Sequence, residues 1–211
     1  MKVSMIGTGN MARGIGSRLI SGGHDVVFMG TEAGKAEEAV AAVKSAGNGN
    51  ASAGALSDEL GDVVVLAVPF GANVELVKEL GSRLAGKVVV DIANPLKPTF
   101  DGLATAADSS SAEEVAKAAV KSAKVVKAFN TTFAGALLSG KAGGLPLDVF
   151  IAGDDEGARN TVSQLVNDGG MRVVDVGPLA HARYLEGIQF LHIILQGSLG
   201  TNWVSGLKIV S

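Results

Sequence analysis

The sequence contains no cysteine, which excludes disulfides, thiolate metal sites and cysteine nucleophiles. Charged residues make up only 18% of the chain and the net charge is −3. The lysines are scattered, so the basic surface typical of a nucleic-acid-binding protein is missing. Histidines are also few: His24, His181 and His192 are the three in the chain. We expect all three to be structural, with His192 as the one candidate for proton delivery, and we expect no metal site.

Long hydrophobic runs are lacking as well. The longest apolar stretches, residues 63–68 and the region around 188–195, fall well below the ~18 residues that a membrane-spanning helix needs. The chain reaches a glycine motif after one strand's length, which leaves no room for a signal peptide. We therefore expect a cytoplasmic protein with no membrane segment.

What the sequence does contain is typical of an α/β protein. Hydrophobic residues make up 47% of the 211 residues, and their periodicity predicts strands and helices that alternate to about residue 176. We expect strands at 3–6, 25–29, 62–68, 88–92, 124–128, 147–152 and 171–175, helices at 10–20, 36–46, 72–84, 113–122 and 156–166, and a loop at 47–54. This order predicts a Rossmann-type, doubly wound and mostly parallel sheet.

The pattern changes near the end of the chain. After Gly177 and Pro178 the sequence is continuously helical in character, over residues 180–195 and again over 202–209. We interpret residues 1–177 as a dinucleotide-binding domain. Residues 178–211 are then a small helical cap over the ligand-binding edge of the sheet, not an independent domain.

A glycine motif follows the first predicted strand and opens the first helix. It fits G-x-G-x-x-G/A and consists of Gly7, Thr8, Gly9, Asn10, Met11 and Ala12. Gly7 permits the tight turn, Gly9 lets the backbone approach a pyrophosphate, and the helix N-terminus offers free N–H groups to the anion. The position of the motif favours a nicotinamide dinucleotide over the alternative, a glycine turn that serves only packing.

The end of the second predicted strand bears on the choice between NAD and NADP. Thr31 and Lys35 favour the 2′-phosphate of NADP, whereas Glu32 favours the ribose hydroxyl of NAD. A structural alternative exists, in which Thr31 caps the next helix and Glu32 is a carboxylate in its first turn.

The carboxyl ends of later strands should surround the nicotinamide, because ligands of open α/β sheets bind in that crevice. These ends carry Ala67, Val68, Pro69, Asn94, Asn130 and Thr132. The small Ala67 lets a flat ring lie against the backbone, and Asn94 or Asn130 could bind the carboxamide. Each asparagine could equally cap a turn or a helix.

Six segments together resemble the NADPH-dependent F420 reductase family. They are IGTGNM (6–11), AVPF (67–70), DIANP (91–95), VKAFNT (126–131), AGDD (152–155) and DVGPLAHARYLE (175–186). Members exchange hydride between NADP and F420, a deazaflavin coenzyme. The resemblance implies that residues 8–11, Thr31, Lys35, Val68 and Pro69 hold NADP(H), and that the deazaflavin lies near Asn94, residues 129–132 and the cap. Glu32 stands where members usually carry arginine.

Hydride transfer between stacked rings needs positioning more than acid–base groups, so we assign no catalytic residue. The cap would cover the ring acceptor with Phe190, Trp203 and Leu207. Cations for an anionic acceptor could be Lys127, Arg183 and Lys208, although Arg183 could instead pair with Glu186.

Two other functions stay open. The glycine motif also resembles the start of pyrroline-5-carboxylate reductase, an imine reductase, and a redox sensor could bind NADP(H) without turnover. The same module is similar to the cytosolic part of ferric-reductase membrane proteins. The expected partners are small molecules, and a homodimer is an open possibility.

Overall fold

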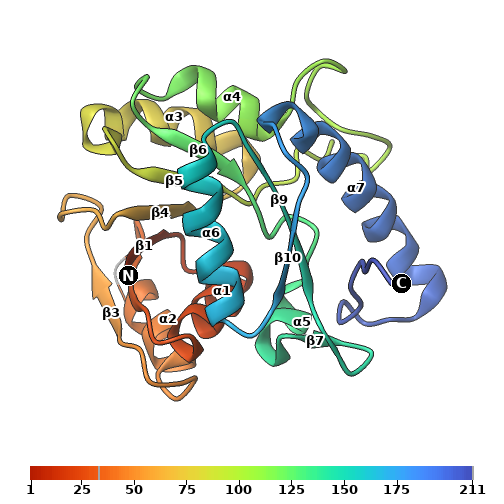
Figure 1. Ribbon diagram of the computed structural model, residues 1–211, viewed down its shortest axis with the longest axis horizontal. Helices are drawn as coiled ribbons and strands as arrows, with labels where there is room; N and C mark the ends of the chain where they lie inside the picture. Colours follow the sequence, from red (N-terminus) through yellow and green to blue (C-terminus); the bar gives the residue numbers. More distant parts are fainter. Residues whose placement is uncertain (33, 211) are drawn as a thin grey trace.

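Eight strands form one sheet, and the structure, a computed structural model, describes residues 1–32 and 34–210 (Figure 1). The strand order is β10-β9-β6-β5-β4-β1-β2-β3. The strands are β1 (Lys2–Ile6), β2 (Asp25–Met29), β3 (Ala51–Gly54), β4 (Val63–Leu66), β5 (Val88–Asp91), β6 (Lys124–Lys127), β9 (Asp148–Gly153) and β10 (Arg172–Asp175). The first six are parallel, β9 is antiparallel to β6, and β10 is parallel to β9. The predicted Rossmann-type, mostly parallel sheet is confirmed.

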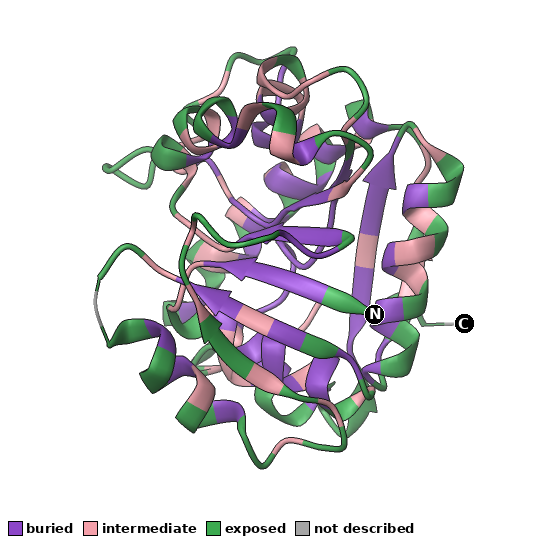
Figure 2. Cartoon of the chain, turned by 90° about the vertical axis from the view of Figure 1, so that its left-hand side faces the viewer, coloured by how far each residue is buried: buried purple, intermediate pink, exposed green. Residues whose placement is uncertain are grey.

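Helices cover both faces of this sheet. One face packs against α1 (Asn10–Ser21), α2 (Lys35–Val43), α5 (Ala134–Ser139) and α6 (Glu156–Asp168); the other packs against α3 (Phe70–Leu80), the 3-10 turn Gly81–Leu84 and α4 (Ser111–Ala118). The central strands are consequently buried along nearly their whole length (Figure 2). Burial on both faces explains why β4 reads Val-Val-Val-Leu without polar alternation.

Three short elements differ from the sequence-based expectation. The predicted loop at 47–54 ends in the edge strand β3, whose Ala-Ser-Ala-Gly composition carries no strand signal because the strand is exposed and packs little. The six-residue helix α5 is too short to show a helical period. A small hairpin, β7 (Lys141–Ala142) with β8 (Leu145–Pro146), lies outside the main sheet.

The C-terminal region contains one long helix rather than two. After β10, a 3-10 turn at Leu179–His181 leads into α7 (Ala182–Leu199), which runs beside β9 and α4 (Figure 1). The predicted helix at 202–209 is wrong. Asn202 and Trp203 have φ angles of 50° and 60°, which a right-handed helix does not allow. The chain then returns to β9, where the Ile209 N–H donates to Asp148 Oδ2 at 2.9 Å.

Candidate functional site

Two adjoining cavities lie where strands β1, β2, β4, β5 and β6 end. The first has a volume of about 660 Å³ and the second about 490 Å³. Both are lined by Gly9, Val68 and Pro69, so they form one groove across the carboxyl edge of the sheet. An elongated ligand with two ends therefore fits this edge better than a compact one.

The glycine motif forms the floor where the cavities meet. Gly7 has a φ angle of +121°, and a Cβ added there would lie 2.2 Å from the carbonyl oxygen of Ala67, so no other residue fits. A Cβ added at Gly9 would meet nothing within 4 Å and would project into open space. Gly9 is the N-cap of α1, whose first turn contains no acidic residue. The loop thus presents free backbone N–H groups and the positive end of the helix dipole to the groove.

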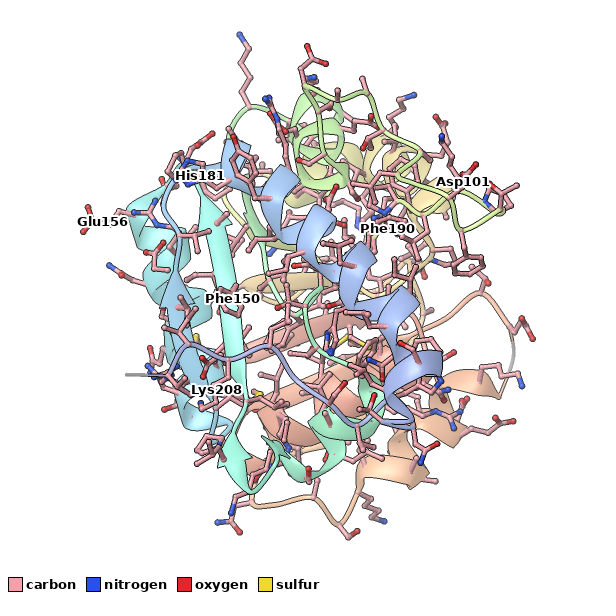
Figure 3. The ribbon with its side chains drawn as sticks, turned by 90° about the vertical axis from the view of Figure 1, so that its right-hand side faces the viewer. Asp101, Phe150, Glu156, His181, Phe190 and Lys208 are labelled. Atoms are coloured by element: carbon pink, nitrogen blue, oxygen red, sulfur yellow. The ribbon has the colours of Figure 1, made fainter. Side chains whose placement is uncertain are left out.

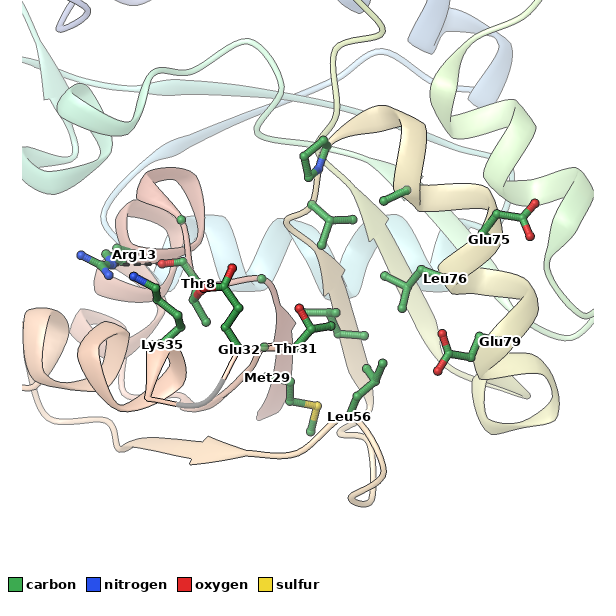
Figure 4. A pocket seen from close by; sticks show the side chains of 17 residues that line it. Thr8, Arg13, Met29, Thr31, Glu32, Lys35, Leu56, Glu75, Leu76 and Glu79 are labelled. Carbon is green, nitrogen blue, oxygen red and sulfur yellow. Dashed lines mark hydrogen bonds between the residues drawn. The ribbon is translucent and has the colours of Figure 1, made fainter.

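The far end of the first cavity gathers Thr31, Glu32 and Lys35 (Figure 4). Helix α2 begins at Lys35 and its N-cap is Gly34, so the alternative in which Thr31 caps this helix is wrong. The acidic residues in the first turn of α2 are Glu37 and Glu38. Glu32 is consequently free of a helix-capping role and lines the cavity.

Arg13 also lines this end, and the sequence analysis missed it. Its Nε donates to the carbonyl oxygen of Thr8 at 3.0 Å, which holds the guanidinium beside the glycine motif. The Nη2 of Arg13 lies 3.6 Å from Glu38 Oε2, and the Nζ of Lys35 lies 3.7 Å from the same oxygen. Two cations therefore meet at one end of the cavity. The available signal was the spacing, since Arg13 stands one helical turn after Gly9.

Two asparagines bind one another in the second cavity. Asn94 Nδ2 donates to the carbonyl oxygen of Asn130 at 2.9 Å, and Asn130 Nδ2 donates to Asn94 Oδ1 at 3.0 Å and to the carbonyl oxygen of Leu185 at 3.0 Å. Neither residue caps a helix of the described chain, so the helix-cap alternative is wrong, whereas Asn130 does lie in a turn that follows β6. Asn130 Oδ1 is buried and has no hydrogen-bond partner within residues 1–32 and 34–210. It is thus a buried acceptor without a partner among the described residues, next to the second cavity.

The other wall of the second cavity comes from the C-terminal region. Gln189 and Ile193 of α7 line it together with Trp203, whose ring lies edge-on to Phe133 at a centroid distance of 5.2 Å. Trp203 was predicted as cover, but Phe190 and Leu207 are not among the lining residues. Gln189 was missed, because only the docking of α7 brings it to the strand ends. Within the described residues, no ionisable side chain lines this cavity.

The three histidines lie outside both cavities. His192 Nδ1 contacts Gln189 Oε1 at 3.1 Å and its Nε2 contacts Ser205 Oγ at 2.8 Å, while burial lowers the pKa of the ring. His24 lies 3.2 Å from Asp168, and His181 Nδ1 contacts the carbonyl oxygen of Val176. Each therefore has structural partners. No group of three or more potential metal ligands occurs in the described part of the chain.

A buried ion cluster ties α7 to the strand ends. Lys127 is fully buried, and its Nζ lies 2.8 Å from Asp91 Oδ2 and 2.6 Å from Glu186 Oε1. It also donates to the carbonyl oxygen of Ala93, which lines the second cavity. Burial raises the pKa of Glu186 against the opposing effect of the Lys127 charge. Lys127 is thus a clamp beneath the cavity and is unavailable to a ligand, contrary to the expectation.

The two other predicted ligand cations are also paired. Arg183 binds Glu113 through Nε–Oε2 and Nη2–Oε1 contacts of 2.8 and 2.5 Å, so its predicted pairing with Glu186 is wrong. Lys208 Nζ lies 2.7 Å from Asp148 Oδ1. The thirteen residues predicted to bind the cofactor, in contrast, all line one or both cavities: Gly7, Thr8, Gly9, Asn10, Met11, Thr31, Lys35, Ala67, Val68, Pro69, Asn94, Asn130 and Thr132.

Comparison with known proteins decides the family. A family profile described as "NADP oxidoreductase coenzyme F420-dependent" matches residues 2–95. The F420-dependent NADP reductase of Methanocaldococcus jannaschii is 32% identical over 206 residues, which cover 89% of either chain. This chain belongs to the F420-dependent NADP reductase family. Its counterpart in Methanothermobacter marburgensis is 31% identical over 92% of each chain. The chain is accordingly an NADP-dependent oxidoreductase.

Structural comparison agrees with this family. The crystal structure of a putative F420-dependent NADP reductase from Arthrobacter sp. FB24 superposes with a TM-score of 0.85 at 28% identity, over the whole of both chains. The metalloreductase STEAP3 of Rattus norvegicus is 33% identical over 89% of this chain, which spans 36% of that protein. A pyrroline-5-carboxylate reductase from Coxiella burnetii shares the fold alone, with 19% identity and a TM-score of 0.60. No helix of the described residues is long and apolar enough to cross a membrane.

Proposed function

We propose that this family member transfers hydride between NADP(H) and the deazaflavin coenzyme F420. The observation that carries the proposal is the continuity of the two cavities, which share Gly9, Val68 and Pro69. A dinucleotide laid along the groove has its adenosine end beside Arg13 and its nicotinamide in the second cavity. Relatives that match over about nine-tenths of this chain are named F420-dependent NADP reductases.

The pyrophosphate fits the glycine motif because Gly9 leaves the space above the loop open. A side chain there would occupy the path of the ligand, whereas the bare backbone lets the N–H groups of the first turn of α1 approach it. Thr8, Asn10 and Met11 complete this contact. The sequence motif and the open geometry support the same assignment.

Recognition of NADP rather than NAD is assigned to Arg13, Lys35 and Thr31. The first two are cations at the end of the first cavity, where a 2′-phosphate would stand, and Thr31 adds a hydroxyl. The Glu32 carboxylate would repel a phosphate at this place, and no ion pair within the described residues neutralises its charge. Arg13 and Lys35 are the cations at this end of the cavity, although both also lie near Glu38, so we propose a preference for NADP(H) that is smaller than it would be without Glu32.

The nicotinamide fits between the small side chains of Ala67 and Ala93 and the asparagine pair. The unpartnered Asn130 Oδ1 would accept a hydrogen bond from the carboxamide of the ring. Gln189, Ile193 and Trp203 then face the ring from the opposite wall and leave a slot for a second flat ring. Two flat rings stacked in this slot would be held face to face, as hydride transfer over ~3–3.5 Å requires.

NADPH, when bound, would supply the hydride, and oxidised F420 would take it up together with one proton. No ionisable side chain of the described residues lines the second cavity, so the proposal assigns this proton to solvent. The chain's own contribution is orientation: the Lys127 cluster holds Ala93 and α7, and Asn130 aligns the nicotinamide. We also propose that the protein is cytoplasmic and that residues 178–211 form a cap over the ring acceptor.

Anaerobic mixing of NADPH with oxidised F420, FMN, FAD or pyrroline-5-carboxylate, followed by NADPH absorbance, tests the proposal. We expect rapid oxidation with F420 alone. Asn130→Leu should lower this rate at least ~10-fold, and the matched control Asn50→Leu, at an exposed surface position, should leave it unchanged. Oxidation by pyrroline-5-carboxylate would favour an imine reductase. Tight NADPH binding without oxidation by any acceptor would favour a sensor.

A further inference from the structure

Gln189 is a buried amide side chain in the wall of the second cavity. Only 1% of its surface is exposed, and its Oε1 contacts the ring of His192, whereas its Nε2 has no hydrogen bond in the described part of the chain. The neighbouring donors are in use, because the Nδ2 atoms of Asn94 and Asn130 and the hydroxyl of Thr132 each donate to an acceptor of the protein. The Gln189 amide can therefore donate to a ligand, provided that its nitrogen faces the cavity.

The orientation of this amide is set by a chain of hydrogen bonds that begins at the backbone. After α7 the chain turns back toward Lys208, so that residues 201–205 lie beside the end of the helix (Figure 3). Gln196 Nε2 donates to the carbonyl oxygen of His192 at 3.0 Å, and Gln196 Oε1 accepts from the backbone N–H of Trp203 at 3.2 Å. A backbone carbonyl only accepts and a backbone N–H only donates, so these contacts allow one orientation of the Gln196 amide.

The same chain decides which nitrogen of His192 carries the proton. Burial lowers the pKa of His192 and so keeps the ring neutral, with one donor and one acceptor nitrogen. Ser205 Oγ accepts from Gln196 Nε2 at 3.0 Å and lies 2.8 Å from His192 Nε2, closer than the 3.3 Å to Gln196 Oε1. The Ser205 hydroxyl therefore donates to His192 Nε2, which leaves the ring proton on Nδ1. Phe133 packs against the ring at a centroid distance of 4.5 Å and restrains its tilt.

Gln189 is consequently turned with its oxygen toward His192 and its nitrogen toward the cavity. The Nδ1–H of His192 donates to Gln189 Oε1 at 3.1 Å, and a donor at this place excludes the opposite orientation of the amide. The N–H groups of Gln189 Nε2 are left for a ligand in the second cavity. The cavity thereby has a buried donor on the side of α7 and a buried acceptor, Asn130 Oδ1, on the side of the strand ends.

A donor on the side of α7 suits the hydride acceptor. In hydride transfer the C–H bond of NADPH breaks with both electrons, and a new C–H bond forms on a ring carbon of the deazaflavin. The ring is thereby reduced, NADPH is oxidised to NADP⁺, and one proton is taken up from solvent. The electron pair delocalises into the pyrimidine part of the ring, so negative charge grows on a ring nitrogen and on the carbonyl oxygen beside it. An N–H aimed at these atoms stabilises the charge as it forms.

We propose that Gln189 is a catalytic residue whose Nε2 donates a hydrogen bond to the pyrimidine edge of the ring acceptor, and that His192 is the positioning residue that orients it. The inference rests on the proposed function, which places the second ring between the nicotinamide and α7. It also specifies the acceptor class, a ring system fused to a pyrimidinedione. A cyclic imine is reduced in its protonated, cationic form and gains nothing from such a donor.

Steady-state kinetics with NADPH and oxidised F420 test the donor. Gln189→Met keeps the length of the side chain and removes the N–H groups, so kcat should fall at least ~10-fold while the KM for F420 rises less than ~3-fold. The Kd for NADPH should stay unchanged. The matched control Gln164→Met, at an exposed position of α6, should leave all three constants unchanged.

Three outcomes of this experiment would overturn the inference, and they are distinguishable. If the wild type reduces F420 and Gln189→Met does so equally fast, the donor role is wrong and the proposed function stands. If Gln189→Met raises the Kd for NADPH at least as much as it lowers kcat, the amide binds the nicotinamide instead. A wild type that binds NADPH but does not reduce F420 would overturn the proposed function together with the inference.

A second set of variants tests the positioning role of His192. His192→Leu should lower kcat about 10-fold, and His192→Asn, whose amide nitrogen can take the place of Nδ1, should restore most of the rate. In the Gln189→Met background, His192→Leu should have little further effect, because His192 acts through Gln189. Losses that multiply in the double variant, or a His192→Asn variant as slow as His192→Leu, would overturn the positioning role.

Discussion

The two ends of the groove are built in different ways. The nucleotide end comes mainly from residues 7–35, one continuous stretch in which backbone conformation does most of the binding. The ring end is assembled from residues 9–11 of the glycine motif and from four distant segments, at residues 67–70, 92–94, 130–133 and 189–203. Local backbone geometry defines the first end, and long-range packing defines the second.

The difference extends to how each end is held in place. Gly7 and Gly9 need no partner side chains, since a turn and a helix N-terminus follow directly from the motif. The ring end depends on Lys127, whose ammonium group is buried between carboxylates from β5 and α7. A substitution at the nucleotide end should therefore weaken cofactor binding more than it lowers the stability of the fold. A substitution beneath the ring end should lower the stability of the fold more than it weakens cofactor binding.

The largest expected effect is the loss of the buried clamp. Lys127→Met should lower the free energy of unfolding by about 3–5 kcal/mol, because it leaves Asp91 and Glu186 buried without their cation. Urea denaturation measures this difference. The control Lys124→Met lies on the same strand, but its ion pair with Asp155 is exposed and should contribute less than ~1 kcal/mol. Equal losses in the two variants would contradict the assignment of Lys127 as a buried clamp.

Gly9→Val should produce the converse result. The new side chain has room in the free protein, so stability should fall by no more than ~1 kcal/mol. It fills the path of the pyrophosphate, so the Kd for NADPH should rise at least ~100-fold. Fluorescence titration gives the Kd. Gly71→Val, at another glycine with open space around it, should bind NADPH normally. Unchanged affinity in Gly9→Val would remove the basis for the pyrophosphate assignment.

Arg13 should contribute to the binding of NADPH but not to the binding of NADH. Arg13→Gln should raise the Kd for NADPH about 10-fold and leave the Kd for NADH unchanged, since the 2′-phosphate alone distinguishes them. Glu32→Gln should strengthen NADPH binding a few-fold by removing a like charge. Lys44→Gln, an exposed change at the end of α2, is the control. If the wild type binds NADH as tightly as NADPH, then Glu32 binds the ribose 2′-hydroxyl of NADH and the proposed preference for NADP(H) is wrong.

The smallest effect is expected where the chain end meets β9. Burial by itself would raise the pKa of Asp148, but hydrogen bonds from Arg172 and Lys208 outweigh it and hold that pKa well below its usual range. Stability from this carboxylate is therefore present above its unfolded pKa of ~3.9 and is lost as the pH falls toward the folded value. Asp148→Asn should cost about 1 kcal/mol at pH 7, and the difference in urea midpoint should shrink below pH ~4. A difference that is constant from pH 7 to pH 3 would contradict this assignment.

Errors in the predicted elements have a common origin. Strands β4 and β5 were identified by dense valine runs, whereas the edge strand β3 was read as a loop because it buries little and needs no such residues. The segment at 202–209 has helical composition, but positive φ angles at Asn202 and Trp203 and the capture of Ile209 by Asp148 hold it extended. Local propensity is decisive only where tertiary contacts do not oppose it.

The sequence by itself determined the sheet, the glycine motif and the family, because hydrophobic period and backbone-dependent binding are both encoded within short stretches. It also placed all thirteen predicted cofactor residues on the edge where the two cavities lie. Only the tertiary structure decided that Lys127 pairs with Glu186, that Arg183 pairs with Glu113, and that Gln189 faces the ring cavity. The two ion pairs join residues that are 59 and 70 positions apart. Which partner a charged side chain finds at such a separation depends on how the helices dock on the sheet, and no local sequence pattern encodes that docking.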